Sequence, residues 1–81
     1  MKCLVYVLKS QADGRLYKGM TNNIERRIYE HSTGKHKSTR PYRPWNLVFT
    51  KEFNSRAEAR EFEKWLKSGV GREFLKEILD P

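Results

Sequence analysis

Two short apolar runs near the N-terminus have the composition of β-strands. Residues 4–8 read Leu-Val-Tyr-Val-Leu, which is rich in β-branched and aromatic side chains, and a similar run covers residues 16–20. The residues between them, 10–14, include an Asp-Gly pair and supply turn chemistry. The pattern therefore predicts an antiparallel hairpin.

The register of this hairpin has two candidate solutions. Pairing Tyr6 with Tyr17 requires a loop centred on residues 11–12, because paired positions in a hairpin keep a constant sum of residue numbers. A two-residue turn at Asp13-Gly14 would instead place Tyr6 opposite Thr21. We favour the first register, in which the two tyrosines face each other directly.

Helix signals follow the hairpin. Asn22 and Glu25 resemble a capping box and Gly34 is a usual helix stop, while Ser55 and Glu58 form a second capping box. The expected elements are a helix over residues 22–33, a polar surface loop over 34–44, a strand from 47–50 towards Phe53, and helices over 56–67 and 71–79, the last ended by Pro81. The resulting order, β-β-α-β-α-α, is that of a small α+β domain.

Length and cysteine content limit the class of protein. A chain of 81 residues barely sustains one hydrophobic core, so we expect a single domain over residues 1–81. The lone Cys3 offers neither an internal disulfide nor a thiolate cluster for zinc, which indicates a reducing compartment. No apolar run approaches the roughly 20 residues that a membrane-spanning helix needs, and the first residues lack the apolar stretch of a signal peptide. We therefore expect a cytoplasmic protein without a membrane partner.

Positive charge is concentrated in the middle of the chain. The formal net charge is +7, and a field of this sign attracts polyanions through phosphate contacts and counterion release. Within residues 26–43, Glu30 is the only acidic residue. The basic residues of this segment are Arg26, Arg27, Lys35, Lys37, Arg40 and Arg43. Nucleic acid is the partner that this distribution favours, and a solvated basic surface is the simpler alternative.

Charged residues also fall on the apolar faces of two expected helices. Ile24 and Ile28 mark the buried stripe of the first helix, and Arg27 and His31 share it under the i, i+3, i+4, i+7 rule. In the second helix Glu63 has the same placement relative to its apolar stripe. A buried charge costs several kcal/mol unless it is paired or used. Two interpretations stay open: a structural Arg27–Glu63 ion pair, or a functional site.

Two tyrosines add to the second interpretation. A site that cleaves a phosphodiester needs a proton acceptor for water, a fixed cation for the developing charge and a metal for the leaving oxygen. The sequence offers residue types for all three roles: Tyr6 or Tyr17 with His31 as the proton acceptor, Arg27 as the cation and Glu63 as the metal ligand. Ordinary packing on a strand is the alternative for each tyrosine.

Six residues stand in a characteristic order and spacing: Tyr6, Tyr17, Gly19, Arg27, His31 and Glu63. This pattern resembles the GIY-YIG nuclease superfamily, which includes the N-terminal incision domain of bacterial excision repair and intron homing endonucleases. The segments 44–48 and 55–67 look especially like the small, free-standing bacterial members. The resemblance covers nearly the whole chain. It implies a three-stranded antiparallel sheet flanked by helices, and a Mg²⁺-dependent endonuclease acting on DNA in repair or recombination.

The resemblance also implies residue roles. Arg27 would stabilise the scissile phosphate, and Glu63 would be the single carboxylate that holds Mg²⁺, with Mn²⁺ as the alternative ion and no organic cofactor. Tyr6 would act on the nucleophilic water, while Tyr17 and His31 would line the same pocket. Which of these three is the general base stays open.

Two positions that follow Tyr17, Lys18 and Gly19, also have expected roles. Gly19 would let the phosphate approach the backbone. Lys18 stands where the family usually has an aliphatic residue, and it shares a strand face with Leu16 and Met20. Its side chain must therefore reach towards solvent or towards phosphate.

Residues 34–45 combine cations with aromatic side chains, a composition that suits contact with nucleic acid. The expected substrate-binding residues are Lys35, Lys37, Arg40 and Arg43 for phosphates and Trp45 for stacking on a base or sugar, beside His36 and Tyr42. Because nothing here encodes base readout, we expect recognition of DNA shape or ends, or a partner protein that supplies targeting. The alternatives are a non-catalytic nucleic-acid-binding module of the same fold and a protein-interaction domain.

Overall fold

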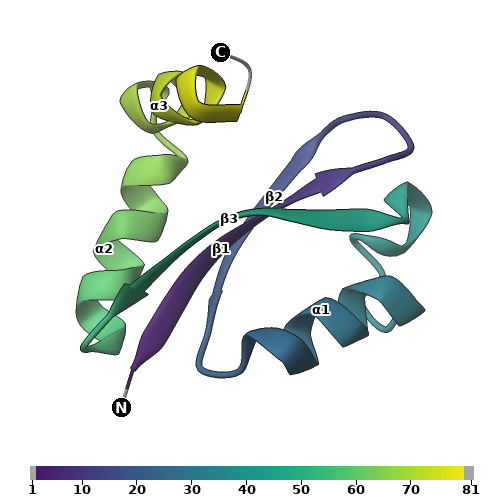
Figure 1. Cartoon of the computed structure of the whole chain (residues 1–81), viewed down its shortest axis with the longest axis horizontal. Helices are drawn as coiled ribbons and strands as arrows, with labels where there is room; N and C mark the ends of the chain where they lie inside the picture. The colour runs from purple at the N-terminus through teal and green to yellow at the C-terminus, as the bar shows by residue number, and fades with distance from the viewer. Residues whose placement is uncertain (1, 80–81) are drawn as a thin grey trace.

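The protein is built on a three-stranded antiparallel sheet with β1 at its centre. The computed structural model describes residues 2–79, and Figure 1 shows the strands crossing the middle of the molecule with α1 on one side and α2 on the other. β1 (Cys3–Ser10) pairs with β2 (Leu16–Thr21) and with β3 (Trp45–Phe53). The predicted α+β class and the order β-β-α-β-α-α are confirmed.

Side chains of β1 alternate between two separate apolar clusters, as the period of two in a strand requires. Val5 and Val7 are fully buried against α2 (Arg56–Leu66) and α3 (Gly69–Leu79). The intervening Tyr6 and its neighbour Leu8 face the opposite way, towards α1 (Ile24–Thr33). The central strand is therefore covered on both faces, and Tyr6 points into the α1 side.

The hairpin register differs from both predicted solutions, because Tyr6 lies opposite Gly19. The loop is neither of the expected turns. The Ser10 hydroxyl accepts hydrogen bonds from the backbone N–H groups of the next turn residues, Ala12 and Asp13, at 3.0 and 3.2 Å. Gly14 adopts a φ of 80°, a left-handed conformation that glycine tolerates without strain. These two local features set a loop over residues 11–15, and they shift the pairing to an intermediate register.

A β-bulge in β3 decides where Trp45 points. Val7 pairs with Phe49 but Leu8 pairs with Leu47, so Val48 is an extra residue in the ladder. An extra residue reverses the faces of the side chains on one side of the bulge relative to those on the other side, so Trp45 and Phe49 point to opposite faces although they are four residues apart. Trp45 consequently joins the cluster on the α1 side, where it packs beside Tyr6 and Leu8.

The helices begin and end close to the predicted residues. The cap of α1 is Asn23, whose side chain accepts from the Arg26 N–H, so the predicted start at Asn22 was one residue early. The stop at Gly34, with a φ of 80°, is as predicted. Ser55 caps α2 as predicted, and its hydroxyl donates back to the Glu58 carboxylate at 3.0 Å.

Two elements differ further from those that the sequence predicts. α3 begins at Gly69, two residues before the predicted start, because only a short break separates it from α2. A short 3₁₀ turn, η1 (Arg40–Tyr42), interrupts the segment that was expected to be an irregular loop. The predicted stop at Pro81 lies outside the described residues. Within residues 2–79, no helix is both long and apolar enough to cross a membrane.

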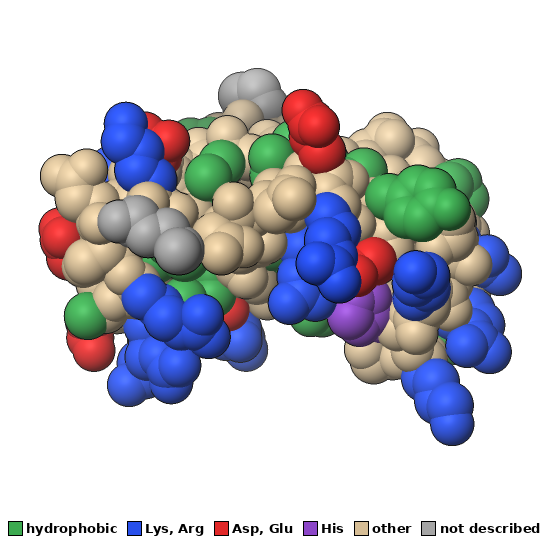
Figure 2. All heavy atoms as spheres, turned by 90° about the horizontal axis from the view of Figure 1, so that it is seen from below, with side chains coloured by type: hydrophobic (Ala, Val, Ile, Leu, Met, Phe, Trp, Pro, Cys, Tyr) green, Lys and Arg blue, Asp and Glu red, His purple; other side chains and the backbone are tan. Residues whose placement is uncertain are grey.

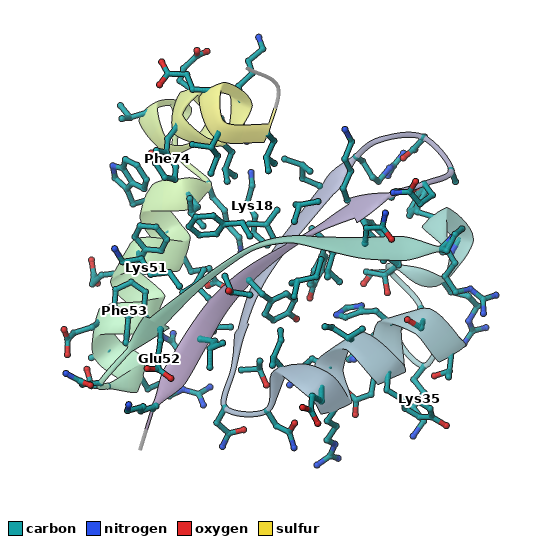
Figure 3. All side chains as sticks on the ribbon, viewed as in Figure 1. Lys18, Lys35, Lys51, Glu52, Phe53 and Phe74 are labelled. Atoms are coloured by element: carbon teal, nitrogen blue, oxygen red, sulfur yellow. The ribbon has the colours of Figure 1, made fainter. Side chains whose placement is uncertain are left out.

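Lys18 lies on the α2 and α3 side of the sheet. Figure 3 shows its side chain on the same side as Phe74, away from α1. Partial burial lowers the pKa of the Lys18 ammonium, and the positive charges of Arg72 and Lys67 lower it further. The side chain therefore reaches towards two other cations, which leaves the α1 side of β2 to the tyrosines.

Candidate functional site

Tyr6 and His31 form a buried polar pair on the α1 side of the sheet. The Tyr6 hydroxyl lies 3.3 Å from His31 Nε2, and the two side chains come from β1 and from the last turn of α1. Both residues are almost completely excluded from solvent, at 2% and 1% exposure. Tyr17 packs against the same imidazole, with ring centroids 4.8 Å apart. The structure thus brings these three predicted site residues together.

Thr39 determines which nitrogen of His31 carries the proton. His31 Nδ1 lies 2.9 Å from the Thr39 hydroxyl oxygen, and that hydroxyl donates to the His36 carbonyl at 3.3 Å. A hydroxyl has one proton to donate, so Thr39 accepts from His31 Nδ1–H. The other nitrogen, Nε2, is then the acceptor for the Tyr6 hydroxyl. A directed chain therefore runs from Tyr6 through His31 to Thr39.

Burial shifts the acid–base properties of this pair in a way that keeps both groups neutral. Desolvation lowers the pKa of His31 to about 4, with smaller contributions from the nearby His36 and Arg27 charges. Desolvation also raises the pKa of the Tyr6 phenol well above its ordinary value, and the neighbouring Tyr17 adds to the shift. At neutral pH the imidazole is an uncharged acceptor and the phenol keeps its proton.

Gly19 provides the space in which the Tyr6 hydroxyl sits. A Cβ atom at this position would lie 2.6 Å from the Tyr6 hydroxyl oxygen and 2.8 Å from the ring carbon that carries it. Both distances are shorter than non-bonded contacts allow. The expected role for Gly19 was to let phosphate approach the backbone, whereas the structure places the phenol of Tyr6 there. Gly19 therefore sets the position of the hydroxyl that the site would use.

Arg27 lies at the solvent-facing edge of the site within a small cluster of charged and polar groups. Its Nη1 is 3.5 Å from Glu30 Oε1 and 3.3 Å from His36 Nε2, and His36 Nε2 is in turn 3.3 Å from the same Glu30 oxygen. The His36 ring stacks on His31 with centroids 4.7 Å apart, which joins this cluster to the buried pair. Hydrogen bonds from His36 and Arg26 lower the pKa of Glu30, so its carboxylate stays charged.

The same cluster borders a cavity of about 300 Å³, which is lined by Arg27, Glu30, His36, Arg26 and residues 21–23. Figure 2 shows an exposed histidine beside a carboxylate and Lys or Arg side chains on this face. His36 keeps 34% of its side chain exposed, whereas His31 is buried. Arg27 keeps 41% of its side chain exposed, so its guanidinium is accessible to a ligand.

Glu63 approaches the site from α2. Its carboxylate is mostly shielded, at 19% side-chain exposure, and its closest cation is Lys67 Nζ at 4.0 Å. The negative charge of Glu63 raises the pKa of Tyr6, and the positive charge of Arg27 lowers it, so both groups act on the same phenol. Among residues 2–79 Arg27 pairs with Glu30 and Glu63 with Lys67, and the structural Arg27–Glu63 ion pair is not formed.

The cations expected to contact substrate fall into two groups. Lys35 and Lys37 are exposed, and Lys35 Nζ lies 5.9 Å from the centre of the Tyr29 ring. Arg40 and Arg43 hold the loop in shape, since their Nε atoms donate to the carbonyls of Gly34 and Arg40 at 2.8 and 3.1 Å. Both arginines are nonetheless exposed, so a phosphate can reach them.

Trp45 does not fit the predicted stacking role. It is 7% exposed, and its indole N–H donates to the Thr39 carbonyl at 2.9 Å. The bulge at Val48 turns the ring inward, where it cannot stack on a base. Trp45 instead fixes Thr39, which orients His31.

Three further residues belong to the site but were not predicted as part of it. Glu30 lies one turn after Arg27, and this spacing could have identified it as an ion-pair partner. The sequence predicts His36 only as an aromatic neighbour of the substrate. No residue pattern indicated a role for Thr39, because that role depends on a loop that folds back under α1.

A divalent ion would depend on Glu63 for its protein ligand. Among residues 2–79, no three His, Cys, Asp or Glu side chains are grouped as a metal site. Mg²⁺ binds through one or two carboxylates and keeps waters and substrate phosphate as its other ligands. A single shielded carboxylate whose charge acts on the Tyr6 phenol fits that kind of site.

Comparisons with known proteins identify the family of the chain. The GIY-YIG catalytic domain family matches residues 2–74. A UPF0213 protein of Staphylococcus haemolyticus is 40% identical over 78 residues, covering 95% of this chain and 94% of that protein. One from Limosilactobacillus reuteri is 34% identical over 82 residues, covering 98% and 84%.

A solved structure shares the fold. The solution structure of a UPF0213 protein from Bacillus halodurans has a TM-score of 0.59 and 39% sequence identity, and the match covers 95% of this chain and 84% of that one. The family match, over residues 2–74, spans most of the described residues. The chain therefore belongs to the GIY-YIG family of nucleases, among its small UPF0213 members.

Proposed function

We propose that the protein is a divalent-metal-dependent endonuclease that hydrolyses a phosphodiester bond of DNA. The single observation that carries the proposal is the buried chain from Tyr6 through His31 to Thr39, placed beside an exposed arginine. Buried polar groups are expensive unless their hydrogen bonds are satisfied, and a fully directed chain of this kind has an obvious use in moving a proton. Repair or recombination of DNA is the setting we infer for such an activity.

The chain of hydrogen bonds supports a route for the proton in the proposed reaction. The Tyr6 oxygen accepts a proton from the attacking water while its own proton passes to His31 Nε2, which the tautomer leaves as an acceptor. Thr39 holds the imidazole in this orientation through Nδ1–H. The low pKa of His31 keeps its Nε2 lone pair available at neutral pH. The general base is thus Tyr6 acting with His31, and Tyr17 packs against them.

Arg27 and Glu63 supply the electrostatic part. The exposed guanidinium of Arg27 is placed to donate hydrogen bonds to the non-bridging oxygens of the scissile phosphate as negative charge develops there. Glu63 would hold Mg²⁺, or Mn²⁺ in its place, and the ion would supply Lewis-acid stabilisation of the leaving oxygen. Its weak pairing with Lys67, at 4.0 Å, leaves the carboxylate available for this role.

The test compares Glu63→Gln with Glu61→Gln, a matched change on the same helix at a carboxylate that is 78% exposed. Purified proteins are incubated with labelled duplex, nicked, branched and single-stranded DNA, with Mg²⁺ or with EDTA. We expect metal-dependent product from wild type and Glu61→Gln, and none from Glu63→Gln, whose DNA affinity is unchanged or slightly stronger because a negative charge near phosphate is removed.

Either of two results would count against the proposal. Wild type that binds every DNA in a salt-sensitive manner but yields no product with Mg²⁺ or Mn²⁺ would identify a non-catalytic nucleic-acid-binding module. Loss of DNA binding in Glu63→Gln would contradict the metal role of that carboxylate.

A further inference from the structure

A second cavity lies on the other side of Arg27 and is not part of the site described above. Its volume is about 390 Å³, and it lies between the start of β1, the end of β2 and the beginning of α2. Arg27, Thr21 and Asn22 line both this cavity and the one that contains Glu30 and His36. Arg27 therefore stands between two adjoining cavities.

Three cations from three parts of the chain line this second cavity. They are Lys2 ahead of β1, Arg27 in α1 and Arg56 in the first turn of α2. No carboxylate is among the described residues that line it. Gathering like charges around an open cavity costs Coulomb energy, which an anionic ligand would relieve.

The existing ion pairs of these cations are easily exchanged. Lys2 Nζ is 3.3 Å from Glu52 Oε1, but the two side chains are 65% and 52% exposed, so the pair is screened by water and contributes little. Arg27 reaches Glu30 only at 3.5 Å. Both cations can turn to a phosphate without breaking a buried interaction.

The remaining lining suits a nucleotide backbone. Asn54 adds a side-chain amide that can donate to a phosphate oxygen, while Cys3 and Met20 give the cavity an apolar wall against which a deoxyribose can pack. A single phosphate contact at Arg27 would leave a strand free to pivot. A second contact fixes its direction relative to Glu63, because phosphate contacts set register and orientation.

We propose that this cavity binds a backbone phosphate of the cleaved strand, adjacent to the scissile phosphate. The contacts are made by Lys2, by Arg56 and by the part of Arg27 that lines this cavity. The inference rests on the proposed function, because it takes the scissile phosphate to lie at Arg27. It adds a part of the substrate site that the nuclease residues alone do not define, and it makes the substrate a continuous strand and not an isolated phosphate ester.

The first measurement is the salt dependence of binding to a 20-base-pair duplex in EDTA, where cleavage does not interfere. The variant is Lys2→Gln with Arg56→Gln. Its matched control is Lys9→Gln with Lys76→Gln, which removes the same charge from a separate pocket at the other end of β1. We expect the slope of log affinity against log salt to fall in magnitude by about 1 for each phosphate that the variant no longer binds, and to stay unchanged in the control.

A second measurement locates the contact. Amide resonances of the ¹⁵N-labelled protein are followed while thymidine tetranucleotide is added. We expect shifts at Cys3, Asn54 and Arg56 in wild type and in the control. In the Lys2→Gln/Arg56→Gln variant we expect the shifts at Cys3 and Asn54 to be lost while those at Tyr17 and His36 persist.

The outcomes separate this inference from the nuclease itself. Equal slopes for the variant and the control, or no shift at Cys3, Asn54 and Arg56, would overturn the phosphate subsite even if wild type cleaves DNA. Absence of cleavage, together with a slope change confined to the variant, would overturn the nuclease and leave the cavity as a binding site for a backbone phosphate of uncleaved DNA. Wild type without salt-sensitive DNA binding would overturn the subsite.

Discussion

The Tyr6 hydroxyl is held between His31 Nε2 and the backbone at Gly19, so a change of one oxygen atom tests its role. We expect Tyr6→Phe to lower cleavage by about 10²–10⁴-fold, the usual range for a lost general acid or base, with DNA affinity unchanged. The matched control is Tyr29→Phe, since Tyr29 is 60% exposed on α1. Single-turnover cleavage and DNA binding are measured for both.

Loss of folding must be separated from loss of chemistry in this comparison. Tyr6→Phe leaves His31 Nε2 without its donor, which costs about 1–3 kcal/mol of unfolding free energy. Urea denaturation gives that value directly. Cleavage by Tyr6→Phe at the rate of Tyr29→Phe would show that the phenol only packs.

His31 makes stability depend on pH. Its folded-state pKa of about 4 lies below the ordinary value of 6.5, so between these values the unfolded chain binds more protons than the folded one. The contribution of the neutral His31 to the free energy of unfolding is therefore complete above pH 6.5 and is lost as the pH falls towards 4. Within that window the loss is up to about 1.4 kcal/mol per pH unit.

Urea denaturation at pH 7.5, 6.5, 5.5 and 4.5 tests this expectation. His31→Gln cannot gain a proton, so its unfolding free energy should change less over the same range. Glu30 and Asp13 have lowered pKa values and also lose stability in acid, but only as their carboxylates protonate, at the lower end of the window. A wild type whose stability is constant from pH 6.5 to 5.5 would show that His31 is not held neutral.

At the scale of elements, α2 and α3 meet at a point where one glycine is required. A Cβ atom at Gly71 would collide with the backbone carbonyl of Trp65 and would lie 2.5 Å from Leu66 Cα. Backbone atoms cannot move aside as a flexible side chain can. We expect Gly71→Ala to cost about 1–3 kcal/mol or more of unfolding free energy, because the two helices must separate.

Gly69, in the first turn of the same helix, is the matched control. A Cβ atom there meets nothing within 4 Å, and alanine favours helix over glycine by up to about 1 kcal/mol. Gly69→Ala should therefore raise the urea midpoint while Gly71→Ala lowers it. Similar midpoints for both variants would mean that the α2–α3 contact adjusts freely.

The elements also show what the sequence could predict. Capping residues such as Ser55 and Gly34 are local signals, and they placed the ends of α1 and α2 within one or two residues. The hairpin register depended on the Ser10 hydroxyl acting within its own loop. The bulge at Val48 leaves no pattern in the strand itself. The register depends on the conformation of the loop, and the bulge depends on pairing with β1. Neither could be predicted from residue patterns.

The same distinction applies to the candidate site. Helical spacing was sufficient to predict that His31 lies on the buried face of α1, whereas Arg27, one turn earlier, lies at the solvent-facing edge of the site with 41% of its side chain exposed. The position of Thr39 depends on how residues 34–45 fold back beneath α1, and the inward direction of Trp45 depends on the bulge at Val48. Residue patterns encode neither feature. The predicted role of Trp45 failed for this reason.

At the scale of the whole molecule, the number of exposed cations leads us to expect that DNA is bound without base recognition. The net charge is +7, and Figure 2 shows several groups of Lys and Arg side chains on one face, one of them beside a histidine and a carboxylate. Exposed cations of this kind contact phosphates, which are the same in every sequence. Binding should therefore be strong in low salt and insensitive to sequence.

Lys35 and Lys37 provide the test, because they are exposed and the segment 34–45 carries them beside the site. Lys35→Gln with Lys37→Gln should weaken binding to unrelated 20-base-pair duplexes by the same factor, and should lower the magnitude of the salt slope by about 1 for each phosphate that is no longer bound. Fluorescence anisotropy at four salt concentrations in EDTA measures both quantities. Since a phosphate contact carries no sequence information, a variant that weakened binding to one duplex far more than to another would show that this segment reads bases, and the targeting of the nuclease would then reside in the chain itself and not in DNA shape or a partner protein.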